Sequence, residues 1–466
     1  MTAKAIKPET LGGFLDFLPD EMIARQPVIE AIRRVYERFG FLPLDTPCME
    51  RPEVLLGDTT KFNKSVFTAR VVRGIEDRDE VGIEDANFML RFDLTVPLAR
   101  VVAAYPDLSK PFKRYQIGKV WRGERPQQGR YREFYQFDFD TIGSRSVLAD
   151  AEVIQIMYTV MKELGLSRFL IRFSSRKILN GLAEVVGCGE KKTEFCRILD
   201  RLDRIGEEEV IKALTRPPDN TYDESALALG PAQADTVRRF LAIDQSQGSM
   251  ATLNAVSLIF NSESPTGAAG ILELSQIAKI LETAKIPVEN WQIDLSVARG
   301  LDYYTGPVFE AILLDAPEFG SVLSGGRFDG LSDRFMPGSD IPGVGASVGL
   351  DRLFAALRKL GLLKKARTLT TAFVTVFSNK EQEASVATAA KLREAGINTE
   401  LYLGDESLRA QVAYATRQEI PYMIILGPDE VANDRVMFKN MVKRKQEVLT
   451  FDECLDRLRV ATTSGV

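Results

Sequence analysis

The sequence predicts an α+β core, a helical segment inserted into that core, and an α/β module at the C-terminal end. Apolar and polar residues alternate through Tyr115–Arg122 and again through Phe134–Asp140, which is typical of the two strands of a hairpin. Residues 175–285 are mostly helical in pattern and rich in charge. From residue 370 onward, strand and helix patterns alternate, which indicates a largely parallel sheet with helices on its faces.

The 466 residues are enough for several domains, and the chain divides where these patterns change. Residues 1–174 are predicted to form the first part of the core, and residues 286–361 the second part. Residues 175–285 form the helical insertion between them. Residues 362–369 read as a linker, and residues 370–466 form the C-terminal module.

The composition limits the classes of function. The chain has no histidine, which excludes a Ser-His-Asp triad, a histidine general base and a histidine metal ligand. A formal net charge of −5 argues against a surface that binds nucleic acid everywhere, so any such contact must come from local basic patches. No apolar run approaches the ~20 residues of a membrane span, and the N-terminus lacks a secretory pattern. We therefore expect a cytoplasmic protein without a membrane partner.

The four cysteines are scattered along the chain, at Cys48, Cys188, Cys196 and Cys454. No CxxC pair is present, so the spacing predicts neither a zinc site nor a disulfide framework. We expect buried or inert thiols and no dedicated metal site.

The connection between the two hairpin strands is unusually rich in charge. It holds Glu124, Gln127 and four arginines, Arg122, Arg125, Arg130 and Arg132. Turns usually use Gly, Asn, Asp or Pro, whereas planar guanidinium groups suit phosphates and carboxylates. The pattern favours an anion site, and a solvated, charged hairpin tip is the alternative.

The second hairpin strand has two different faces. Gln136, Asp138 and Asp140 fall on one face, and Phe137 and Phe139 fall on the other, because side chains alternate along a strand.

These residues carry a resemblance to a known family. Lys113–Gly143 resembles the second signature motif of class II aminoacyl-tRNA synthetases, and its continuation GRYREFYQFDFD resembles the histidyl-tRNA synthetases. The resemblance implies a class II synthetase-like catalytic domain with a mixed, mainly antiparallel sheet flanked by helices, and a C-terminal anticodon-binding domain. It also implies that ATP activates L-histidine to histidyl-adenylate, that the histidyl group passes to the 3′ end of tRNA(His), and that the protein is a homodimer.

The N-terminal segment fits the same resemblance. A helical stripe predicts a helix over Pro19–Phe39, and FLPLDTPCME predicts a strand that contains Pro47. Helix, glycine, strand and proline resemble the first class II motif, which forms the dimer interface in that family. An ordinary αβ unit with an edge proline is the alternative. The polar segment Lys61–Ala86 predicts a loop.

The stretch RFDLTVPLAR follows a strand that begins at Phe88–Leu90. Asp93 and Thr95 are two residues apart and would share a face on a strand, with a helix from Pro97. By resemblance Asp93 and Thr95 bind the α-amino group of the substrate, and Leu94 also belongs to the histidine site. The alternative is an Asp/Thr pair that caps the helix.

Within the hairpin, the resemblance implies roles for single residues. Arg122 would hold the α-phosphate and act in catalysis, Phe134 would stack on adenine, and Gln136 would join the amino-group site. Further ATP contacts are implied for Glu124, Arg130 and Tyr131, and tRNA contacts for Gln127 and Arg132.

The stretch IDLSVARGLDYYTGPVFEAILL places charged residues between two apolar, strand-like flanks. It resembles the histidine-specific signature RGLDYYTG of the family. By resemblance Arg299 contacts the substrate carboxylate and the α-phosphate and is catalytic. Tyr304 would hold the imidazole together with Asp140, and Tyr303 would also contact histidine. An Arg299–Asp302 pair that locks a turn is the alternative.

Two glycine-rich stretches follow. SVLSGGRFDGL resembles the second specific motif of the family, but Ser324 replaces one of its usual glycines and Phe328 its usual tyrosine. IPGVGASVGLDRLFAALRKL resembles the third class II motif and predicts a strand that leads into a helix. By resemblance Arg352, in the first helical turn, contacts the γ-phosphate; pairing with Asp351 is the alternative.

The C-terminal module would be the anticodon-binding domain. Basic residues near its predicted terminal hairpin are candidate phosphate contacts of tRNA: Lys439, Lys443, Arg444 and Lys445. A solvated, charged hairpin is the alternative.

The resemblance implies ATP as a substrate, accompanied by Mg²⁺, and no tightly bound metal or organic cofactor. Two alternative functions remain. The first is that of a non-catalytic paralogue with the same fold, which serves as a regulatory subunit of ATP phosphoribosyltransferase or as a tRNA-sensing module. The second is that of a class II synthetase for another amino acid. The regulatory subunit lacks the C-terminal domain and usually degrades the Arg299-type motif, and both are intact here. The RGLDYYTG stretch argues against a synthetase for another amino acid.

Overall fold

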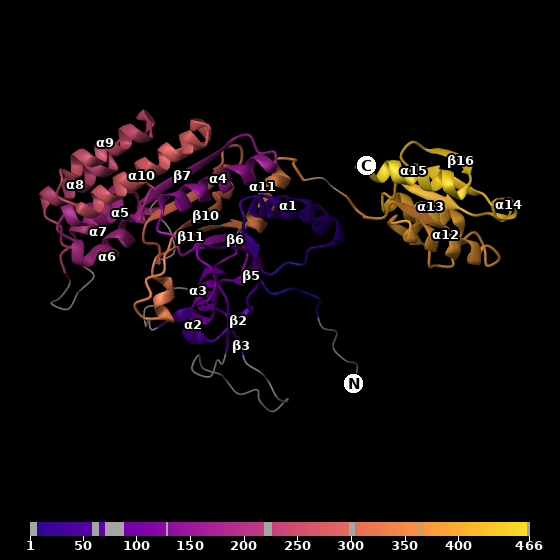
Figure 1. The fold of residues 1–466 in the computed structure, drawn as a ribbon, viewed down its shortest axis with the longest axis horizontal. Coiled ribbons are helices and arrows are strands. Elements are labelled where there is room, and N and C mark those ends of the chain that lie inside the picture. The colour runs from indigo at the N-terminus through magenta and orange to yellow at the C-terminus, as the bar shows by residue number, and fades with distance from the viewer. Residues whose placement is uncertain are drawn as a thin grey trace, which may run out of the picture. The chain divides into compact units, whose positions relative to one another are not determined.

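The computed structural model describes residues 7–57, 65–69, 88–126, 129–218, 226–297, 303–363 and 366–463. The chain divides into two compact units, one of Met1–Asp16 and Ile29–Leu362 and one of Phe17–Val28 and Leu363–Val466 (Figure 1). Each unit has its own sheet and its own core.

The first unit is built on an eight-stranded sheet. Its strand order is β1 (Leu42–Pro43), β5 (Phe112–Trp121), β6 (Glu133–Ile142), β11 (Gly343–Gly349), β10 (Ser321–Arg327), β9 (Pro307–Leu313), β7 (Phe169–Ser175) and β8 (Trp291–Ile293). The two outermost pairs, β1 with β5 and β7 with β8, are parallel, and the inner pairs are antiparallel. The predicted mixed, mainly antiparallel sheet is confirmed.

The hairpin of β5 and β6 shows the predicted two faces. Phe137 and Phe139 pack against Tyr36 of α1 (Pro19–Arg38), with ring centroids 4.9 and 4.8 Å apart. The Tyr36 hydroxyl also donates to the Phe137 carbonyl oxygen at 3.1 Å. In Figure 1, α4 (Val147–Glu163) and α11 (Leu350–Lys359) lie beside the sheet. The acidic face of β6 is therefore left for the opposite side.

The segment Phe41–Glu50 is not the single strand that its sequence predicts. It forms only β1 and β2 (Met49–Glu50), and β2 joins β4 (Phe88–Leu90) and β3 (Thr68–Ala69) in a separate three-stranded sheet. Between β1 and β2, the Thr46 and Pro47 carbonyls accept hydrogen bonds from Arg91 at 2.5 and 3.3 Å. Because Pro47 has no N–H, this stretch cannot continue a strand ladder through that residue.

The prediction that Asp93 and Thr95 share a strand face is wrong. Helix α3 (Thr95–Ala104) already begins at Thr95, so the two residues lie on either side of a helix start. Asp93 Oδ1 accepts a hydrogen bond from the Val96 backbone N–H at 3.0 Å, which is the capping contact named as the alternative.

The predicted insertion is helical. It contains α5 (Arg176–Val185), α6 (Lys192–Leu199), α7 (Leu202–Thr215), α8 (Pro231–Leu241), α9 (Ser249–Phe260) and α10 (Pro265–Thr283). These helices belong to the same compact unit as the sheet, and Glu273 of α10 ties them to it by accepting from Ser175 Oγ at 2.8 Å. The division into separate domains stays a prediction. The short helix α2 (Pro52–Leu56) completes the unit.

The second unit is an α/β sandwich, as predicted. Its sheet has the order β13 (Thr399–Leu401), β12 (Ala372–Val374), β14 (Tyr422–Ile425), β15 (Val436–Asn440) and β16 (Lys445–Leu449), of which the first three strands are parallel. Phe373 and Val374 belong to two different buried clusters, so both faces are covered. The covering helices are α12 (Gln382–Glu394), α13 (Leu408–Arg417) and α15 (Phe451–Thr463); α14 (Pro428–Ala432) is a short addition that the sequence did not predict.

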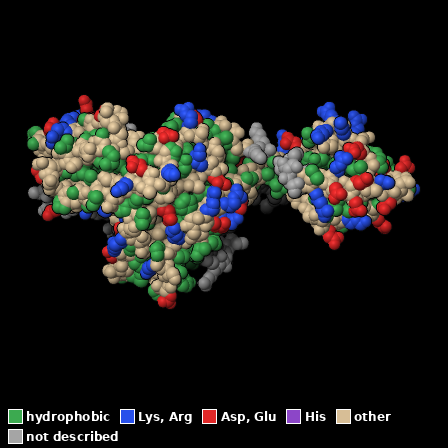
Figure 2. Space-filling model, turned by 45° about the horizontal axis from the view of Figure 1, so that its top comes forward, with side chains coloured by type: hydrophobic (Ala, Val, Ile, Leu, Met, Phe, Trp, Pro, Cys, Tyr) green, Lys and Arg blue, Asp and Glu red, His purple; other side chains and the backbone are tan. Residues whose placement is uncertain are grey.

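On the face that Figure 2 draws, basic and acidic side chains are interspersed. Cys188, Cys196 and Cys454 are buried thiols, whereas Cys48 is exposed.

Candidate active site

A cleft opens along the face of the first unit's sheet that carries Gln136, Asp138 and Asp140. It consists of two adjoining cavities, of about 150 and 360 Å³. Both are lined by Arg122, Arg130 and Arg352, so they are two ends of one cleft. The walls come from β6, β10, β11, the hairpin connection and the start of α11.

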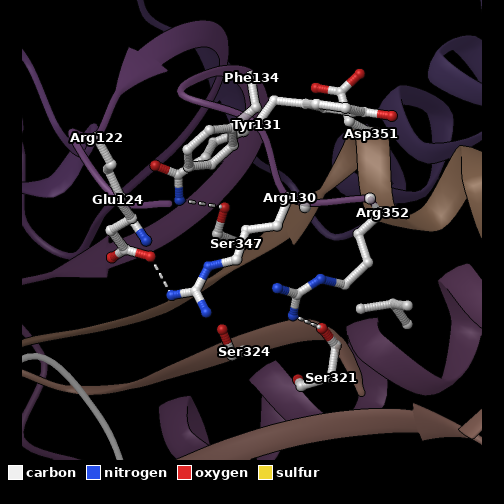
Figure 3. Close-up of a pocket in the computed structure, with 14 residues that line it drawn as sticks. Arg122, Glu124, Arg130, Tyr131, Phe134, Ser321, Ser324, Ser347, Asp351 and Arg352 are labelled. Atoms are coloured by element: carbon white, nitrogen blue, oxygen red, sulfur yellow. Dashed lines mark hydrogen bonds and ion pairs between the residues drawn. The ribbon is translucent and has the colours of Figure 1, made fainter. Parts of the chain in front are cut away.

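One end of the cleft is rich in guanidinium groups. Arg122 donates from Nε to the Phe92 carbonyl at 3.0 Å and lies over the Phe134 ring at 5.2 Å. Arg352 donates from Nη1 to the Ser321 carbonyl at 2.6 Å, and Arg130 pairs with Glu124. Figure 3 shows the guanidinium groups of Arg130 and Arg352 side by side in the cavity.

These arginines repel one another. Burial lowers the pKa of Arg352, and the nearby charges of Arg130 and Arg122 lower it further. The side chain of Glu124 is half-exposed and compensates only part of the positive charge of the three arginines. A bound anion with several oxygens would relieve the repulsion, so this end of the cleft suits a phosphate chain.

The remaining residues of the hairpin connection divide into two groups. Glu124, Tyr131 and Phe134 line the smaller cavity with the arginines. Arg132 does not: its guanidinium donates to the Glu124 and Gly12 carbonyls at 3.1 and 3.3 Å, so it braces the connection.

The other end of the cleft is acidic and aromatic. Asp93, Thr95, Asp138 and Asp140 line it together with the two tyrosines of the YY pair. Asp140 forms an ion pair with Arg114, at 2.7 Å, and Arg114 is fully buried. Burial raises the pKa of Asp140, and Arg114 opposes that rise. This end suits a ligand with a positive charge and N–H donors.

The two tyrosines form one wall of the acidic end. The Tyr303 hydroxyl donates to Asp93 Oδ2 at 3.3 Å, and the Tyr303 and Tyr304 rings meet edge to face at 5.1 Å. A Cβ atom at Gly326 would lie 2.8 Å from Tyr304 Cδ1. A larger residue at position 326 would therefore clash with the Tyr304 ring, so only glycine fits there.

The floor of the acidic end also depends on a glycine. A Cβ atom at Gly345 would lie 2.2 Å from Asp140 Oδ1. Of the two departures from the usual glycine-rich motif, Ser324 lines both cavities, and Phe328 is buried with its ring 6.2 Å from that of Tyr303.

Not every predicted site residue lines the cleft in the part of the chain that the structure describes. Arg299 and Gln127 lie outside the described residues, as does most of Lys61–Ala86. Leu94 is buried and presents its carbonyl oxygen to Arg114 Nη2 at 3.1 Å instead of lining the cleft. Lys443 and Arg444 are exposed in the connection between β15 and β16 of the second unit.

The structure adds residues that the sequence did not single out. Arg114 lies directly opposite Asp140 in the β5–β6 register, and Ser347 lies opposite Asp138 in the β6–β11 register. The first pairing was accessible from the hairpin pattern, because strand partners follow from the length of the connection. Ser321 and Ser324 also line the cleft; both lie in the glycine-rich stretch SVLSGGRFDGL, but neither of them was assigned a role in the site from the sequence.

Two further observations concern the described part of the chain. None of its helices is long and apolar enough to cross a membrane. No group of three or more Cys, Asp or Glu side chains there is arranged to hold a metal ion.

Comparisons with known proteins agree along the whole chain. The family model for histidyl-tRNA synthetase matches residues 13–353, and the model for an anticodon binding domain matches residues 371–460. The histidine–tRNA ligase of Clostridium tetani is 38% identical over 478 residues, which cover 99% of this chain and 100% of the relative. That of Rhodopirellula baltica is 38% identical over 465 residues, with 98% and 100% covered.

Solved structures give the same picture. The histidyl-tRNA synthetase of Nostoc sp. PCC 7120 superposes with a TM-score of 0.80 at 30% identity, covering 98% of this chain and 100% of that one. An ATP phosphoribosyltransferase regulatory subunit/histidyl-tRNA synthetase from Bacillus halodurans shares the fold, with a TM-score of 0.70 at 22% identity over 88% of this chain and 97% of its own.

Proposed function

The chain belongs to the histidyl-tRNA synthetase family, and on that premise we propose how its cleft carries out the reaction. The activity is that of a histidine–tRNA ligase, which joins L-histidine to tRNA at the expense of ATP. One observation supports the assignment of roles: a single cleft has a cluster of arginines at one end and a cluster of carboxylates at the other. These charges match a nucleotide triphosphate and the ammonium group of an amino acid.

ATP would occupy the arginine end. Arg122 would hold the α-phosphate, Arg130 and Arg352 the outer phosphates, and Phe134 would stack on adenine. Tyr131 and Glu124 would line the nucleotide site. Mg²⁺ would enter with ATP, because Mg²⁺ is usually held by substrate phosphates, water and one or two carboxylates.

Histidine would occupy the acidic end. Its ammonium group would bind to Asp93, Thr95 and Gln136. Leu94 would hold the backbone between Asp93 and Thr95 in place. Asp140 and Tyr304 would contact the two ring nitrogens, and Tyr303 would hold Asp93 in place.

The first chemical step needs no general base, because the attacking carboxylate is already ionised. It attacks the α-phosphorus, the bond to the β-phosphate bridge breaks, and diphosphate leaves with the electron pair. Arg122 and Arg299 would neutralise the two anions as they meet. In the second step a terminal ribose hydroxyl of tRNA attacks the acyl carbon and gives up its proton. The bond from that carbon to the phosphate oxygen breaks, and AMP leaves with the electron pair.

Histidine-dependent exchange of pyrophosphate into ATP tests this proposal. We expect exchange with L-histidine and background exchange with each other proteinogenic amino acid, because only a ring with two nitrogens meets both Asp140 and Tyr304. A lack of exchange, or exchange driven by another amino acid, would contradict the proposal.

Transfer RNA would be bound through local contacts. Residues 371–460 match the anticodon-binding model, and we propose that Lys443 and Arg444 contact the phosphates of tRNA. Gln127 and Arg132 would contact it near the active site. Since the reaction uses tRNA and ATP, we propose the cytoplasm as its location.

We also propose a homodimer, formed through the edge around β1 and β2. A groove of about 630 Å³ lies there, and Leu42, Met49 and Tyr105 expose 62%, 51% and 62% of their surface. Exposed apolar side chains next to unpaired strand edges are typical of an interface.

Substitution of both Leu42 and Tyr105 by glutamate tests the dimer. Light scattering should give twice the chain mass for the unmodified protein and a single chain mass for the variant. Leu403→Glu, at a residue of the second unit that is 91% exposed, is the matched control and should leave the mass doubled. If the unmodified protein had the mass of a single chain, the dimer would be refuted.

A further inference from the structure

Two buried acceptors at the acidic end of the cleft have neither a hydrogen bond nor an ion pair within the part of the chain that the structure describes. Among the described residues, Oδ1 of Asp138 and Oε1 of Gln136 are buried and have no hydrogen-bond partner. Asp138 is 3% exposed and Gln136 is 9% exposed. Buried acceptors without partners are costly, so both point to a missing donor.

Ser347 fixes the orientation of both groups. Gln136 donates from Nε2 to Ser347 Oγ at 2.9 Å. The Ser347 hydroxyl in turn bonds to Asp138, its partner in the β6–β11 register. The Ser347 hydroxyl has a single hydrogen, which it donates to Asp138, so it has none to donate to Gln136 Oε1. Gln136 Oε1 and the second carboxylate oxygen, Asp138 Oδ1, therefore remain as acceptors without a donor among the described residues.

The other carboxylates of this end have charged or hydrogen-bonding partners. Asp140 Oδ2 also lacks a hydrogen bond among the described residues, but it forms an ion pair with Arg114 Nη2 at 2.7 Å, and Glu310 pairs with Arg172. Asp93 accepts from Val96 at 3.0 Å and from Tyr303 at 3.3 Å. Asp138 is therefore the buried carboxylate with most capacity left for a ligand.

The charge around Asp138 favours a cation over a neutral donor. Burial raises the pKa of Asp138; Arg114 opposes the rise, and Asp140 and Asp93 add to it. With one buried arginine among three carboxylates, an incoming positive charge is needed to balance the site.

We propose that Asp138 is a substrate-binding residue, which with Gln136 accepts N–H bonds from the α-ammonium group of histidine while Ser347 holds both acceptors in position. This inference rests on the proposed function and extends it to two residues, Asp138 and Ser347. The ammonium group has three N–H donors, and Asp138 would share them with Asp93, Thr95 and Gln136.

Two ligands separate the ammonium group from the ring. Histidinol has the imidazole ring and the ammonium group but no carboxylate, and imidazolepropionate has the ring and the carboxylate but no ammonium group. Calorimetry measures the binding of both without any turnover. For Asp138→Asn we expect histidinol to bind about 10- to 100-fold more weakly, the range for loss of a hydrogen bond to a charged group. Imidazolepropionate should bind within about twofold of its normal affinity.

Ser347→Ala provides the second variant. It leaves the Asp138 charge in place but frees both acceptors to turn, so it should produce the same selective loss at smaller amplitude. Equal losses for both ligands would assign Asp138 to the ring and overturn the proposal, as would unchanged histidinol binding in Asp138→Asn. Pyrophosphate exchange by the unmodified protein reports separately on the proposed function, so the two failures are distinguishable.

Discussion

Replacement of Arg114 by methionine is expected to lower the free energy of unfolding by about 3–5 kcal/mol, the usual cost of breaking a buried ion pair by removing one partner. Arg114 is fully buried, pairs with Asp140 and donates to the Leu94 carbonyl. Without it, Asp140 and Asp138 would remain as buried, uncompensated carboxylates. Denaturant unfolding near pH 8 measures the loss.

The pH dependence of this loss has a definite sign. Burial already raises the pKa of Asp140 and of Asp138 above the value of an unfolded carboxyl, and loss of Arg114 would raise both further. Below about pH 6 both carboxyls are largely protonated in the folded state with or without Arg114, so the variant loses little stability there. The difference in free energy of unfolding between the variant and the unmodified protein grows as the pH rises through about 6 and 7.

The double variant Arg114→Met with Asp140→Asn provides the control. It removes both charges of the pair and should recover most of the lost stability, as neutral replacements of buried pairs often do. A deficit that is the same at every pH and is not recovered by the second substitution would show that Arg114 acts by packing alone.

The second large effect is expected from Arg122→Lys, which should lower the rate of histidine-dependent pyrophosphate exchange by about 10²–10³-fold, the range for loss of one preorganised charge-stabilising donor. Lysine keeps the positive charge but loses the planar fork. It would also lose the bond to the Phe92 carbonyl and the stacking on Phe134. Exchange assays at saturating ATP and histidine measure the rate.

Arg132→Lys is the matched control in the same connection. The Arg132 guanidinium binds the Glu124 and Gly12 carbonyls and does not line the cleft. Its exchange rate, measured without tRNA, should stay within about threefold of normal. If Arg122→Lys changed only the apparent affinity for histidine, Arg122 would act in ground-state binding and not on the transition state.

The sequence was sufficient for the hairpin and for much of the cleft. Strict alternation in β6 separated Phe137 and Phe139 from the acidic face, and this separation is what aims Asp138 and Asp140 into the cavity. The glycine-rich strand and the helix after it correctly placed Arg352 in the first turn of α11.

The rest of the cleft depends on contacts between strands that are distant in sequence. The bond between Ser347 and Asp138 requires the β6–β11 register, which joins residues about two hundred positions apart. Asp93 and Thr95 line the same cavity as Asp138 and Asp140, but the predicted backbone was wrong, because a spacing of two fits a strand face and also a helix start. No local pattern distinguishes those two cases.

The gathering of Arg122, Arg130 and Arg352 has a practical consequence for work with this protein. A pocket of like charges that lacks its nucleotide attracts any small multivalent solute of opposite sign. Phosphate or sulfate in a buffer would occupy it and would act as a competitor of the nucleotide. Kinetic constants for such a protein are therefore meaningful only when the salt in the solution is stated alongside them.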